Sequence, residues 1–398
     1  MLSVNRSGSK RGLSLVLTSA LLTACLEPQP APDLPARPSS DFTITNLVDR
    51  LEKPWSVAAL PDGGFLITEI SGKLLRHTPG VAPVEISGLP NDIFVGGQGG
   101  LLDVVLSPDF TRSGEVYISY AYGTEDANGT ALLRATFNGN ALENPTVIFR
   151  ASPPKSAAQH FGGKIAFLPD DTLVLTLGDG FAYREDAQKA DTHLGKLVRL
   201  NRDGGVPSDN PFIGKDKDGR AFKPQIYSLG HRNVQGLAVD SETGELWEHE
   251  HGPRGGDELN RIIAGANYGW PLATKGRDYQ GARISPYESF EGMIDPIHNW
   301  VPSIAPSGLA IYRGDMFPDW NGDALIGGLA SRDLRRVDLE NGVSVGEEDL
   351  LSDLNGRVRD VRVASDGAVL ILLESRDVDG DGKLDANSGQ LLRITPKS

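Results

Sequence analysis

The sequence predicts an all-β protein, and three observations carry this prediction. Glycine (47) and proline (26) are abundant among the 398 residues, and only 7% are aromatic, a composition typical of a chain with many turns. Helical patterns are weak, with only residues 185–189 and 258–264 locally helical in character. A unit made of an apolar strand, a turn containing Asp, and a second apolar strand recurs along the chain.

Each copy of this unit is expected to form a β-hairpin, because β-branched and aromatic residues flank a turn rich in Asp and Gly. One hairpin cannot bury both of its faces, so the copies must pack around a common axis. A β-sandwich is the alternative, and a β-helix would need shorter and more regular repeats. The pattern therefore favours a six-bladed β-propeller. The six copies span residues 55–69, 103–121, 164–180, 234–251, 308–329 and 358–375.

The N-terminal segment is typical of an export signal. Basic residues precede an apolar stretch at 13–22, which is too short to span a bilayer. The sequence Leu-Thr-Ala-Cys at 22–25 resembles a bacterial lipobox, although an ordinary signal peptide with an incidental cysteine is the alternative. We therefore expect a signal peptide at 1–24, a Pro-rich tether at 25–40 attached through lipidated Cys25, and the propeller domain at 41–398. Leu26, in place of Asp, predicts a periplasmic location at the outer membrane of a Gram-negative bacterium.

Net charge limits the partners of the chain. The formal charge is −14 and the isoelectric point is near 5.0. An acidic surface repels polyanions, so nucleic acid is not an expected partner. Membrane contact is expected only through the N-terminal lipid. Because Cys25 is the single cysteine, the fold has no disulfide and depends on its hydrophobic core.

Several loops carry more unusual chemistry than packing requires. His160 lies in a Gly-flanked loop, and an imidazole with an ordinary pKa suits a general base. A surface histidine is the alternative. Arg232 and Asn233 follow a glycine and can offer a guanidinium plane and an amide to a ligand; here the alternative is a surface salt bridge. Gln98 lies in a Gly-rich loop that lacks the spacing of a phosphate-binding loop.

The segment 249–258 is a candidate metal-binding loop. His249 and His251 lie on one face of a strand and could form a zinc pair, but no third ligand is evident. A loop so rich in glycine and acidic residues suits calcium better. Residues 377–385 have the Asp spacing of a calcium loop without flanking helices, so they are either an accessory calcium site or a plain acidic turn.

Arg357 and Arg359 are expected on one side of a strand because they are two residues apart. Two like charges facing one way repel each other unless an anion lies between them. The pair therefore indicates a carboxylate or phosphate ligand, with a solvated strand edge as the alternative.

Taken in order, these loops resemble the glucose/sorbosone dehydrogenase family of soluble aldose sugar dehydrogenases that use pyrroloquinoline quinone (PQQ). The resemblance covers roughly residues 44–396, and it also includes the signature at 300–309. It is carried by residues 96–105, 160–165, 195–205, 230–237, 250–261, 267–271 and 356–361.

The resemblance implies that aldose sugars are oxidised at C1 to lactones, with PQQ and calcium as cofactors. His160 matches the general base and Arg232 the residue that stabilises the developing oxyanion. Calcium would act as a Lewis acid on the quinone. Electrons would pass to an unidentified acceptor of the respiratory chain. The cofactor contacts implied are Gln98, Arg232, Asn233, Tyr279, Arg357 and Arg359, and the metal ligands implied are Gly252, Pro253, Glu258 and Tyr268.

One position departs from the family pattern. Ala330 stands where relatives carry a lysine that binds the cofactor, and Arg332 is the candidate to supply that charge. Two other functions remain open from the sequence. A calcium-dependent sugar lactone hydrolase would have no use for the arginine pair, and a non-catalytic propeller that binds a sugar or a protein would not explain why the site motifs occur together.

Overall fold

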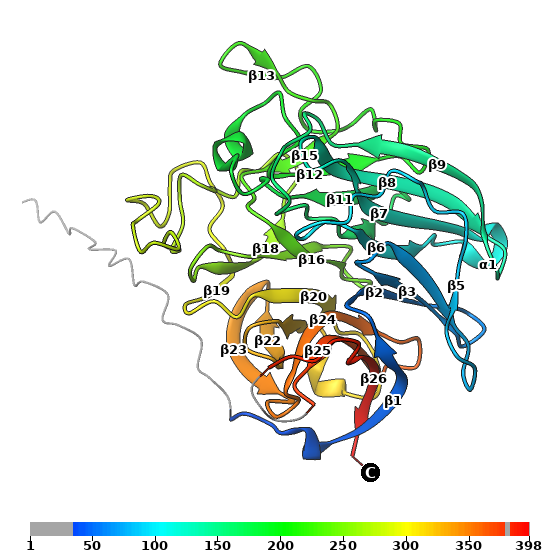
Figure 1. The fold of residues 1–398 in the computed structure, drawn as a ribbon. Helices are drawn as coiled ribbons and strands as arrows, with labels where there is room; N and C mark the ends of the chain where they lie inside the picture. Colours follow the sequence, from blue (N-terminus) through cyan, green and yellow to red (C-terminus); the bar gives the residue numbers. More distant parts are fainter. Residues whose placement is uncertain (1–34, 379–382, 398) are drawn as a thin grey trace, which may run out of the picture. The chain divides into compact units, whose positions relative to one another are not determined.

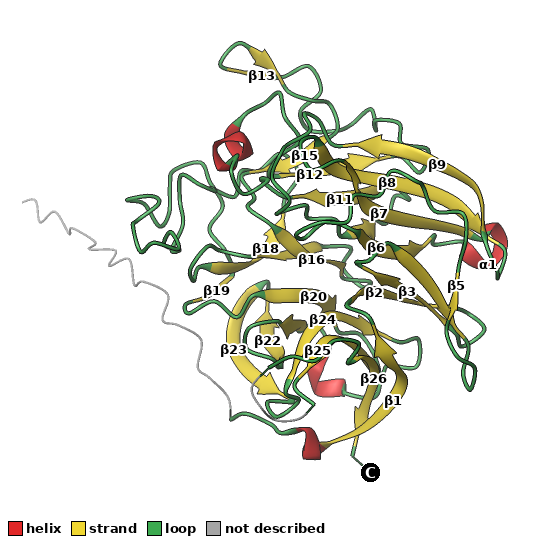
Figure 2. Ribbon diagram, viewed as in Figure 1, coloured by secondary structure: helices red, strands yellow, loops and turns green. Residues whose placement is uncertain are grey.

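The computed structural model describes residues 35–378 and 383–397. Six four-stranded antiparallel sheets supply nearly all of the secondary structure (Figures 1 and 2). The inner strand of each sheet lies beside the inner strands of two neighbouring sheets, which closes the ring. The predicted six-bladed β-propeller is therefore confirmed, and each of the six predicted hairpins forms the first two strands of one blade.

Each blade runs from its inner strand outward. Blade one consists of β2 (Pro54–Ala59), β3 (Phe65–Glu69), β4 (Lys73–His77) and β5 (Val84–Glu85). Blade two consists of β6 (Leu101–Leu106), β7 (Glu115–Gly123), β8 (Asn128–Phe137) and β9 (Leu142–Arg150). Blade three consists of β10 (Ile165–Phe167), β11 (Leu173–Leu177), β12 (Lys196–Leu200) and β15 (Ile226–Leu229). Blade four consists of β16 (Val234–Val239), β17 (Leu246–Glu250), β18 (Asp257–Ile262) and β19 (His298–Trp300). Blade five consists of β20 (Pro306–Ile311), β21 (Ala324–Gly328), β22 (Leu334–Glu340) and β23 (Val343–Leu350). Blade six consists of β24 (Gly356–Val363), β25 (Val369–Arg376), β26 (Gly389–Pro396) and β1 (Phe42–Leu51).

The other elements are short. They are the two-stranded sheet of β13 (Asp216–Lys217) and β14 (Arg220–Ala221), the helix α1 (Phe110–Ser113), and the 3-10 turns η1 (Ser39–Asp41), η2 (Arg184–Gln188) and η3 (Pro318–Trp320).

The two ends of the domain meet in the sixth blade. There β1 pairs antiparallel with β26, from Phe42 opposite Pro396 to Leu51 opposite Gly389, and the two strands lie side by side in Figure 1. The first strand in sequence thus completes the last blade. This pairing covers the outer edge of β26 and joins the N-terminal part of the domain to its C-terminal part.

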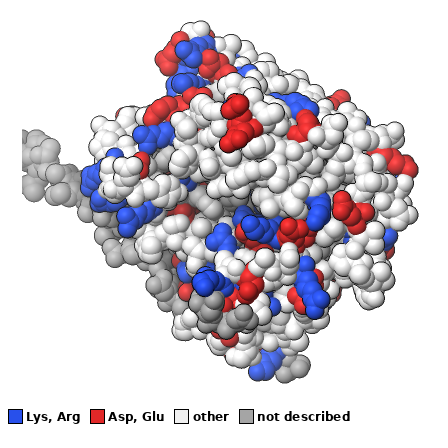
Figure 3. Space-filling view, in the orientation of Figure 1, with Lys and Arg blue, Asp and Glu red and all other residues white. Residues whose placement is uncertain are grey.

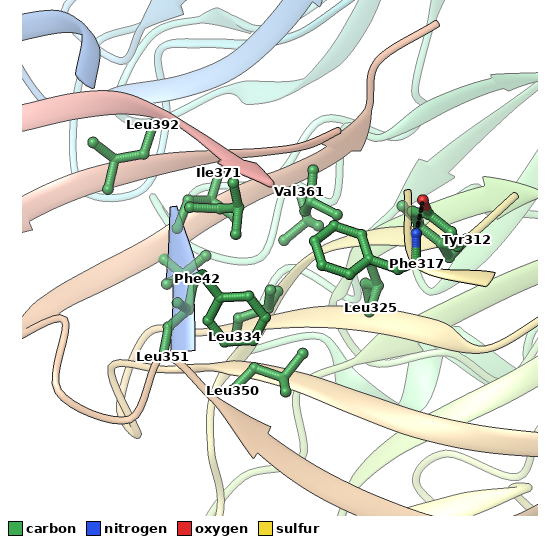
Figure 4. Close-up of a cluster of buried hydrophobic side chains, with 14 of the residues drawn as sticks. Phe42, Tyr312, Phe317, Leu325, Leu334, Leu350, Leu351, Val361, Ile371 and Leu392 are labelled. Carbon is green, nitrogen blue, oxygen red and sulfur yellow. Dashed lines mark hydrogen bonds between the residues drawn. The ribbon is translucent and has the colours of Figure 1, made fainter. Parts of the chain in front are cut away.

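Hydrophobic clusters fill the spaces between neighbouring blades. One such cluster joins blades five and six, where Phe42 lies among side chains that include Tyr312, Phe317 and Ile371 (Figure 4). Comparable clusters lie between every other pair of adjacent blades. Because both faces of a middle strand are covered in this way, β3 and β11 are buried at every position. Apolar side chains are accordingly nearly continuous in such strands instead of alternating.

Some local details differ from the sequence prediction. Residues 258–264 were expected to be locally helical, and this was wrong, because 258–262 belong to β18. Among residues 37–40, Arg37 donates its amide to Asp349 and Ser39 contacts Asp353. The predicted signal peptide, Cys25 and the centre of the acidic loop, residues 379–382, lie outside the described residues. Within the described ranges, no helix has the length and apolar character needed to cross a bilayer.

Candidate active site

The inner strands of all six blades begin around one central cavity of about 270 Å³, which we call the channel pocket. Such convergence is expected because each inner strand is the first strand of its blade, so the loops that enter them meet at one end of the axis. A larger cavity of about 450 Å³ lies at the edge of blades three and four and contains none of the predicted site residues. The channel pocket is lined by Lys53, Trp55, Ile70, Gly97, Gln98, Leu102, Phe161, Gly162, Asn233, Gln235, His251, Ala305, Leu329, Arg357, Arg359 and Glu374.

His160 lies on the loop before β10, at the edge of this pocket. Its backbone amide donates to Gln98 Oε1 at 2.8 Å, and its Nδ1 lies 2.7 Å from Asp179 Oδ1. Burial lowers the pKa of His160, the bond to Asp179 opposes this shift, and the charge of Arg232 adds to it. A carboxylate can only accept, so a neutral imidazole carries its proton on Nδ1 and leaves Nε2 as the basic atom.

Asp179 is held by two further donors. It accepts the Phe181 amide at 2.7 Å and the indole Nε1–H of Trp270 at 2.8 Å. Its side chain is 1% exposed, so its orientation is fixed from three sides. The arrangement has the geometry of a base whose tautomer is set by a buried acid.

Arg232 lies on the loop before β16 and contacts a second cavity of about 260 Å³. Its Nη1 donates to the carbonyl oxygens of His251 and Gly252, each at 2.8 Å, and its Nη2 lies 3.4 Å from the Tyr279 hydroxyl. The guanidinium also lies over the Trp270 ring, 5.4 Å from its centre. The structure thus brings Arg232, Tyr279 and the predicted calcium-binding carbonyl of Gly252 together.

The two strand arginines face the channel pocket, as their spacing predicts. Arg359 binds Glu374 Oε2 through Nη2 at 2.6 Å, and Arg357 Nε lies 3.6 Å from the same oxygen. Burial raises the pKa of Glu374, but the charges of Arg359 and Arg357 bring it below its usual value. Lys53 also lines the pocket, so three cations face one carboxylate.

Arg332 does not line the channel pocket. Its Nη1 lies 3.4 Å from Asn355 Oδ1. The pKa of Arg357 is lowered mainly by burial, and the charge of Arg332 makes a smaller contribution in the same direction. Ala330 is exposed, and its amide donates to Ile304. The additional cation in the pocket wall is Lys53, from the first blade.

The predicted metal ligands fall into separate places. Pro253 lines the same cavity as Arg232. Glu258 contacts Asn260 on β18, whereas the Tyr268 hydroxyl donates to the Arg261 carbonyl and accepts the Ile263 amide. No hydrogen bond joins Glu258 to Tyr268 in the described structure, so a calcium site shared by their side chains stays a prediction.

Sequence reasoning missed three residues of the site, namely Lys53, Asp179 and Glu374. Asp179 had a usable signal, because an acidic residue flanked by glycines directly follows the buried strand β11. Glu374 is an acidic residue within the apolar strand β25. Lys53 has no comparable signal.

Comparison with known proteins identifies the family. The family described as glucose / sorbosone dehydrogenase matches residues 51–384. The chain belongs to the glucose/sorbosone dehydrogenase family. This family's matched region includes every residue of the channel pocket, from Lys53 to Glu374.

Relatives of known structure extend the match. Aldose sugar dehydrogenase YliI of Escherichia coli K12 is 40% identical, over 88% of this chain and 92% of that protein. The crystal structure of soluble aldose sugar dehydrogenase from E. coli in the apo-form has a TM-score of 0.82 at 37% identity, covering 89% of this chain and 100% of that one. The PQQ-bound aldose sugar dehydrogenase of Streptomyces coelicolor has a TM-score of 0.72 at 28% identity, covering 90% and 100%. Family membership makes this chain an oxidoreductase.

Proposed function

We propose that this protein oxidises aldose sugars at C1 to lactones with PQQ as the electron acceptor. The observation that carries the proposal is the His160–Asp179 pair at the edge of a pocket with excess positive charge. The pair supplies a base, and the pocket suits a ligand with several carboxylates. Names of similar proteins, among them a PQQ-bound aldose sugar dehydrogenase, support the same assignment.

The residues of this chain account for the proton chemistry. We assign His160 Nε2 to take the proton of the C1 hydroxyl, while Asp179 holds Nδ1–H and stabilises the imidazolium that forms. As this proton leaves, the C1 hydride is lost, and C1 becomes the lactone carbonyl. Arg232 stabilises negative charge that develops on the C1 oxygen. PQQ, when bound, supplies the two-electron acceptor.

The channel pocket fits an anionic cofactor. The positive charges of Lys53, Arg357 and Arg359 outnumber the single negative charge of Glu374 in the pocket wall. The attraction of an anion to the three cations therefore outweighs its repulsion by Glu374. Arginine geometry suits bidentate contact with carboxylates. Gln98 and Asn233 add amide groups to the wall. We therefore assign these residues to PQQ binding, with Tyr279 as a contact at the second cavity.

Calcium is proposed at the carbonyl oxygens of Gly252 and Pro253. Backbone carbonyls are a donor type that calcium prefers. Gly252 O accepts a hydrogen bond from Arg232 Nη1 at 2.8 Å, and its second lone pair is available to an ion. The two carbonyl groups are neutral, so a bound anionic cofactor would supply the negative charge that balances the calcium ion. The ion would act as a Lewis acid.

The deciding experiment is dye-linked oxidation of a panel of aldoses by the purified protein, with and without PQQ and calcium. We expect activity only when both are added, with loss in His160→Ala. Absence of activity together with absence of PQQ binding would overturn the proposal and leave a non-catalytic propeller. Hydrolysis of sugar lactones without PQQ would instead indicate the hydrolase.

Export and lipid attachment at Cys25 are a separate proposal, supported by the basic, apolar and Leu-Thr-Ala-Cys segments at 6–25. We expect the mature protein at the periplasmic side of the outer membrane, passing electrons to an acceptor of the respiratory chain. Mass spectrometry of the mature N-terminus should show acylated Cys25. Release of Cys25→Ser into the soluble periplasmic fraction is the expected result, and unchanged membrane attachment would contradict it.

A further inference from the structure

A buried polar cluster lies between blades three and four, outside both cavities of the candidate site. Glu248 and Glu250 alternate on one face of β17, and their cross-strand partners on β18, Asn260 and Glu258, face the same way. His231 joins them from the loop that follows β15. His231, Glu248 and Asn260 are 0% exposed. Neither cavity wall contains any of these five residues.

Three atoms of this cluster are buried without a hydrogen-bond partner. They are His231 Nδ1, Glu248 Oε2 and Asn260 Oδ1. His231 Nδ1 lies 3.7 Å from Glu248 Oε1, which is too long for a hydrogen bond. Unpaired buried polar atoms are costly and rare, and three in one place require an explanation.

Protonation alone does not satisfy these atoms. In the described parts of the chain, no Lys or Arg side chain forms an ion pair with Glu248, Glu250 or Glu258, although the charges of Arg232 and Lys275 act on Glu250 and Glu258 from farther away. If Glu248 Oε1 were protonated, its distance of 3.7 Å from His231 Nδ1 would still be too long for a hydrogen bond. When His231 carries its proton on Nε2, the three unpaired atoms, His231 Nδ1, Glu248 Oε2 and Asn260 Oδ1, each have a lone pair available for a metal ion. One cation would satisfy all of them.

We propose that His231, Glu248 and Glu250 bind one divalent transition-metal ion, with Zn²⁺ as the expected ion and Asn260 Oδ1 as a fourth donor. Ligand atoms of the first three residues lie within 4.8 Å of one another. One imidazole and two carboxylates suit zinc better than calcium, which prefers oxygen alone.

The surroundings of His231 suit a metal ligand. Its Nε2 lies 2.8 Å from Ser228 Oγ, and its ring stacks on Tyr268 at 4.8 Å. A hydrogen bond from Nε2–H to the serine would leave the Nδ1 lone pair directed at the carboxylates. Metal-ligating histidines are commonly oriented by such a bond. Asn260 Nδ2 likewise donates to Glu248 Oε1 at 2.8 Å.

The opposite face of the same strand does not offer this site. His249 Nε2 donates to the Gly308 carbonyl and His251 Nε2 to the Pro306 carbonyl, at 3.0 and 2.8 Å. Both imidazoles therefore use these nitrogens to join blade four to blade five. These hydrogen bonds do not favour the zinc pair considered from the sequence, and the glutamates that alternate with the histidines along the chain, Glu248 and Glu250, are the proposed ligands instead.

An ion here would be structural rather than catalytic, because its ligands are buried away from both cavities. It would also support the candidate site. Glu250 Oε2 accepts the Arg232 amide at 2.5 Å, and His231 is the residue before Arg232. Metal binding would thus fix the loop that carries Arg232 from two sides. This inference does not depend on sugar oxidation.

The test measures bound metal. The chelator-treated protein is incubated with Zn²⁺, separated from free ion by gel filtration and analysed by elemental mass spectrometry. We expect one Zn²⁺ per chain in the wild type and in Glu69→Gln, a buried strand glutamate outside the cluster. Glu248→Gln and His231→Gln should bind at least about 100-fold more weakly, because even a second-shell change can cost that much. Equal zinc in all four proteins, or none in the folded wild type, would overturn the proposal.

X-ray absorption of the zinc-loaded wild type covers the case in which a variant fails to fold. The expected spectrum shows nitrogen and oxygen ligands at about 2.0–2.2 Å, including one imidazole. A spectrum without imidazole would place the ion elsewhere and overturn the assignment. Excess Ca²⁺ should not displace the zinc; displacement would contradict the predicted nitrogen ligand.

Discussion

At the residue scale, the backbone of His160 adopts a conformation that side chains other than glycine seldom accept. Its φ is +52°, and Gly162 and Gly163 nearby also have positive φ. Such a residue costs about 1–3 kcal/mol unless its surroundings hold it. The hydrogen bond that its amide donates to Gln98 Oε1 and the bond between its ring and Asp179 provide this restraint. The strain and its restraints together indicate that the position of the imidazole matters for function.

Replacement of Asp179 tests this interpretation. Asp179→Asn should lower kcat/KM for aldose oxidation by about 10²–10⁴-fold, because the amide no longer fixes the Nδ1–H tautomer. His160 must be neutral to act as a base, and its pKa lies below its usual value. The wild-type activity should therefore fall only below about pH 6.5. Loss of the carboxylate removes a contribution that raises this pKa, so the acid limb should move to lower pH in the variant.

The control is Asp171→Asn, which changes an exposed aspartate at the turn of the same hairpin. Steady-state rates across pH 4–9 provide the measurement. Retention of full activity by Asp179→Asn would contradict the assignment of His160 as the base.

The cations of the channel pocket make different predictions. Arg359→Gln should weaken PQQ binding by about 10–100-fold, because a largely buried charged hydrogen-bond donor is lost. Lys53→Met should weaken it by at most about 5-fold, since exposed charges contribute up to about 1 kcal/mol. Titration calorimetry with PQQ measures both, with Lys73→Met as the control: its partly exposed lysine lies on the same blade and outside the pocket. Unchanged affinity in Arg359→Gln would contradict the proposed cofactor position.

The sequence could predict the site only where a motif carries chemistry. His160, Arg232 and the pair at 357 and 359 stand out because glycines or like charges surround them. Lys53 stands out in no such way, and it reaches the pocket because the ring brings the start of β2 close to β24. This proximity joins residues about 300 positions apart, and no local pattern encodes it.

At the element scale, β18 shows how tertiary contacts decide secondary structure. The segment at 258–264 has polar and apolar residues at spacings that suit a short helix. In the fold it pairs with β17 on one side and β19 on the other, and most of it is buried. Propensity is a weak signal in so short a segment, and pairing on both edges outweighs it.

The pairing of β1 with β26 makes a prediction about stability. Phe42 is 6% exposed and lies 6.2 Å from the Phe317 ring and 6.1 Å from the Trp320 ring. Phe42→Ala should lower the free energy of unfolding by about 3–5 kcal/mol, because the cavity forms where β1 closes the ring. Urea denaturation measures the change. The exposed neighbour Thr43→Ala should change it by less than about 0.5 kcal/mol, and equal effects would show that β1 does not anchor the sixth blade.

At the scale of the whole molecule, charges are distributed in two ways. On the face drawn in Figure 3, acidic and basic side chains lie beside one another. Ion pairs with an exposed partner also occur in the described chain, such as that of Arg76 with Asp62. The interior contains a different kind of network. Lys164 on blade three binds Asp360 on blade six at 2.8 Å, and Arg362 joins Asp360 to Asp103 on blade two.

This network links blades that are far apart in sequence, so its loss should affect the whole propeller. Lys164→Met should lower the free energy of unfolding at pH 7 by about 3 kcal/mol or more, because it removes one partner of a buried pair. The control Arg393→Gln removes an exposed pair with Asp366 and should cost about 0.2–1 kcal/mol. Urea denaturation at several pH values provides the measurement.

The pH dependence of this difference has a definite sign. Burial raises the pKa of Asp360, but the charges of Arg362 and Lys164 lower it further, so its net pKa lies below the usual value. Its ionised form therefore stabilises the fold above the unfolded pKa of about 3.9, and that stabilisation is lost as the pH falls through the folded pKa. The gap between wild type and Lys164→Met should shrink in acid. A gap that stays constant from pH 7 to acid would show that the lysine contributes through packing against Trp55, which lies 4.5 Å from its ammonium group, and not through its charge.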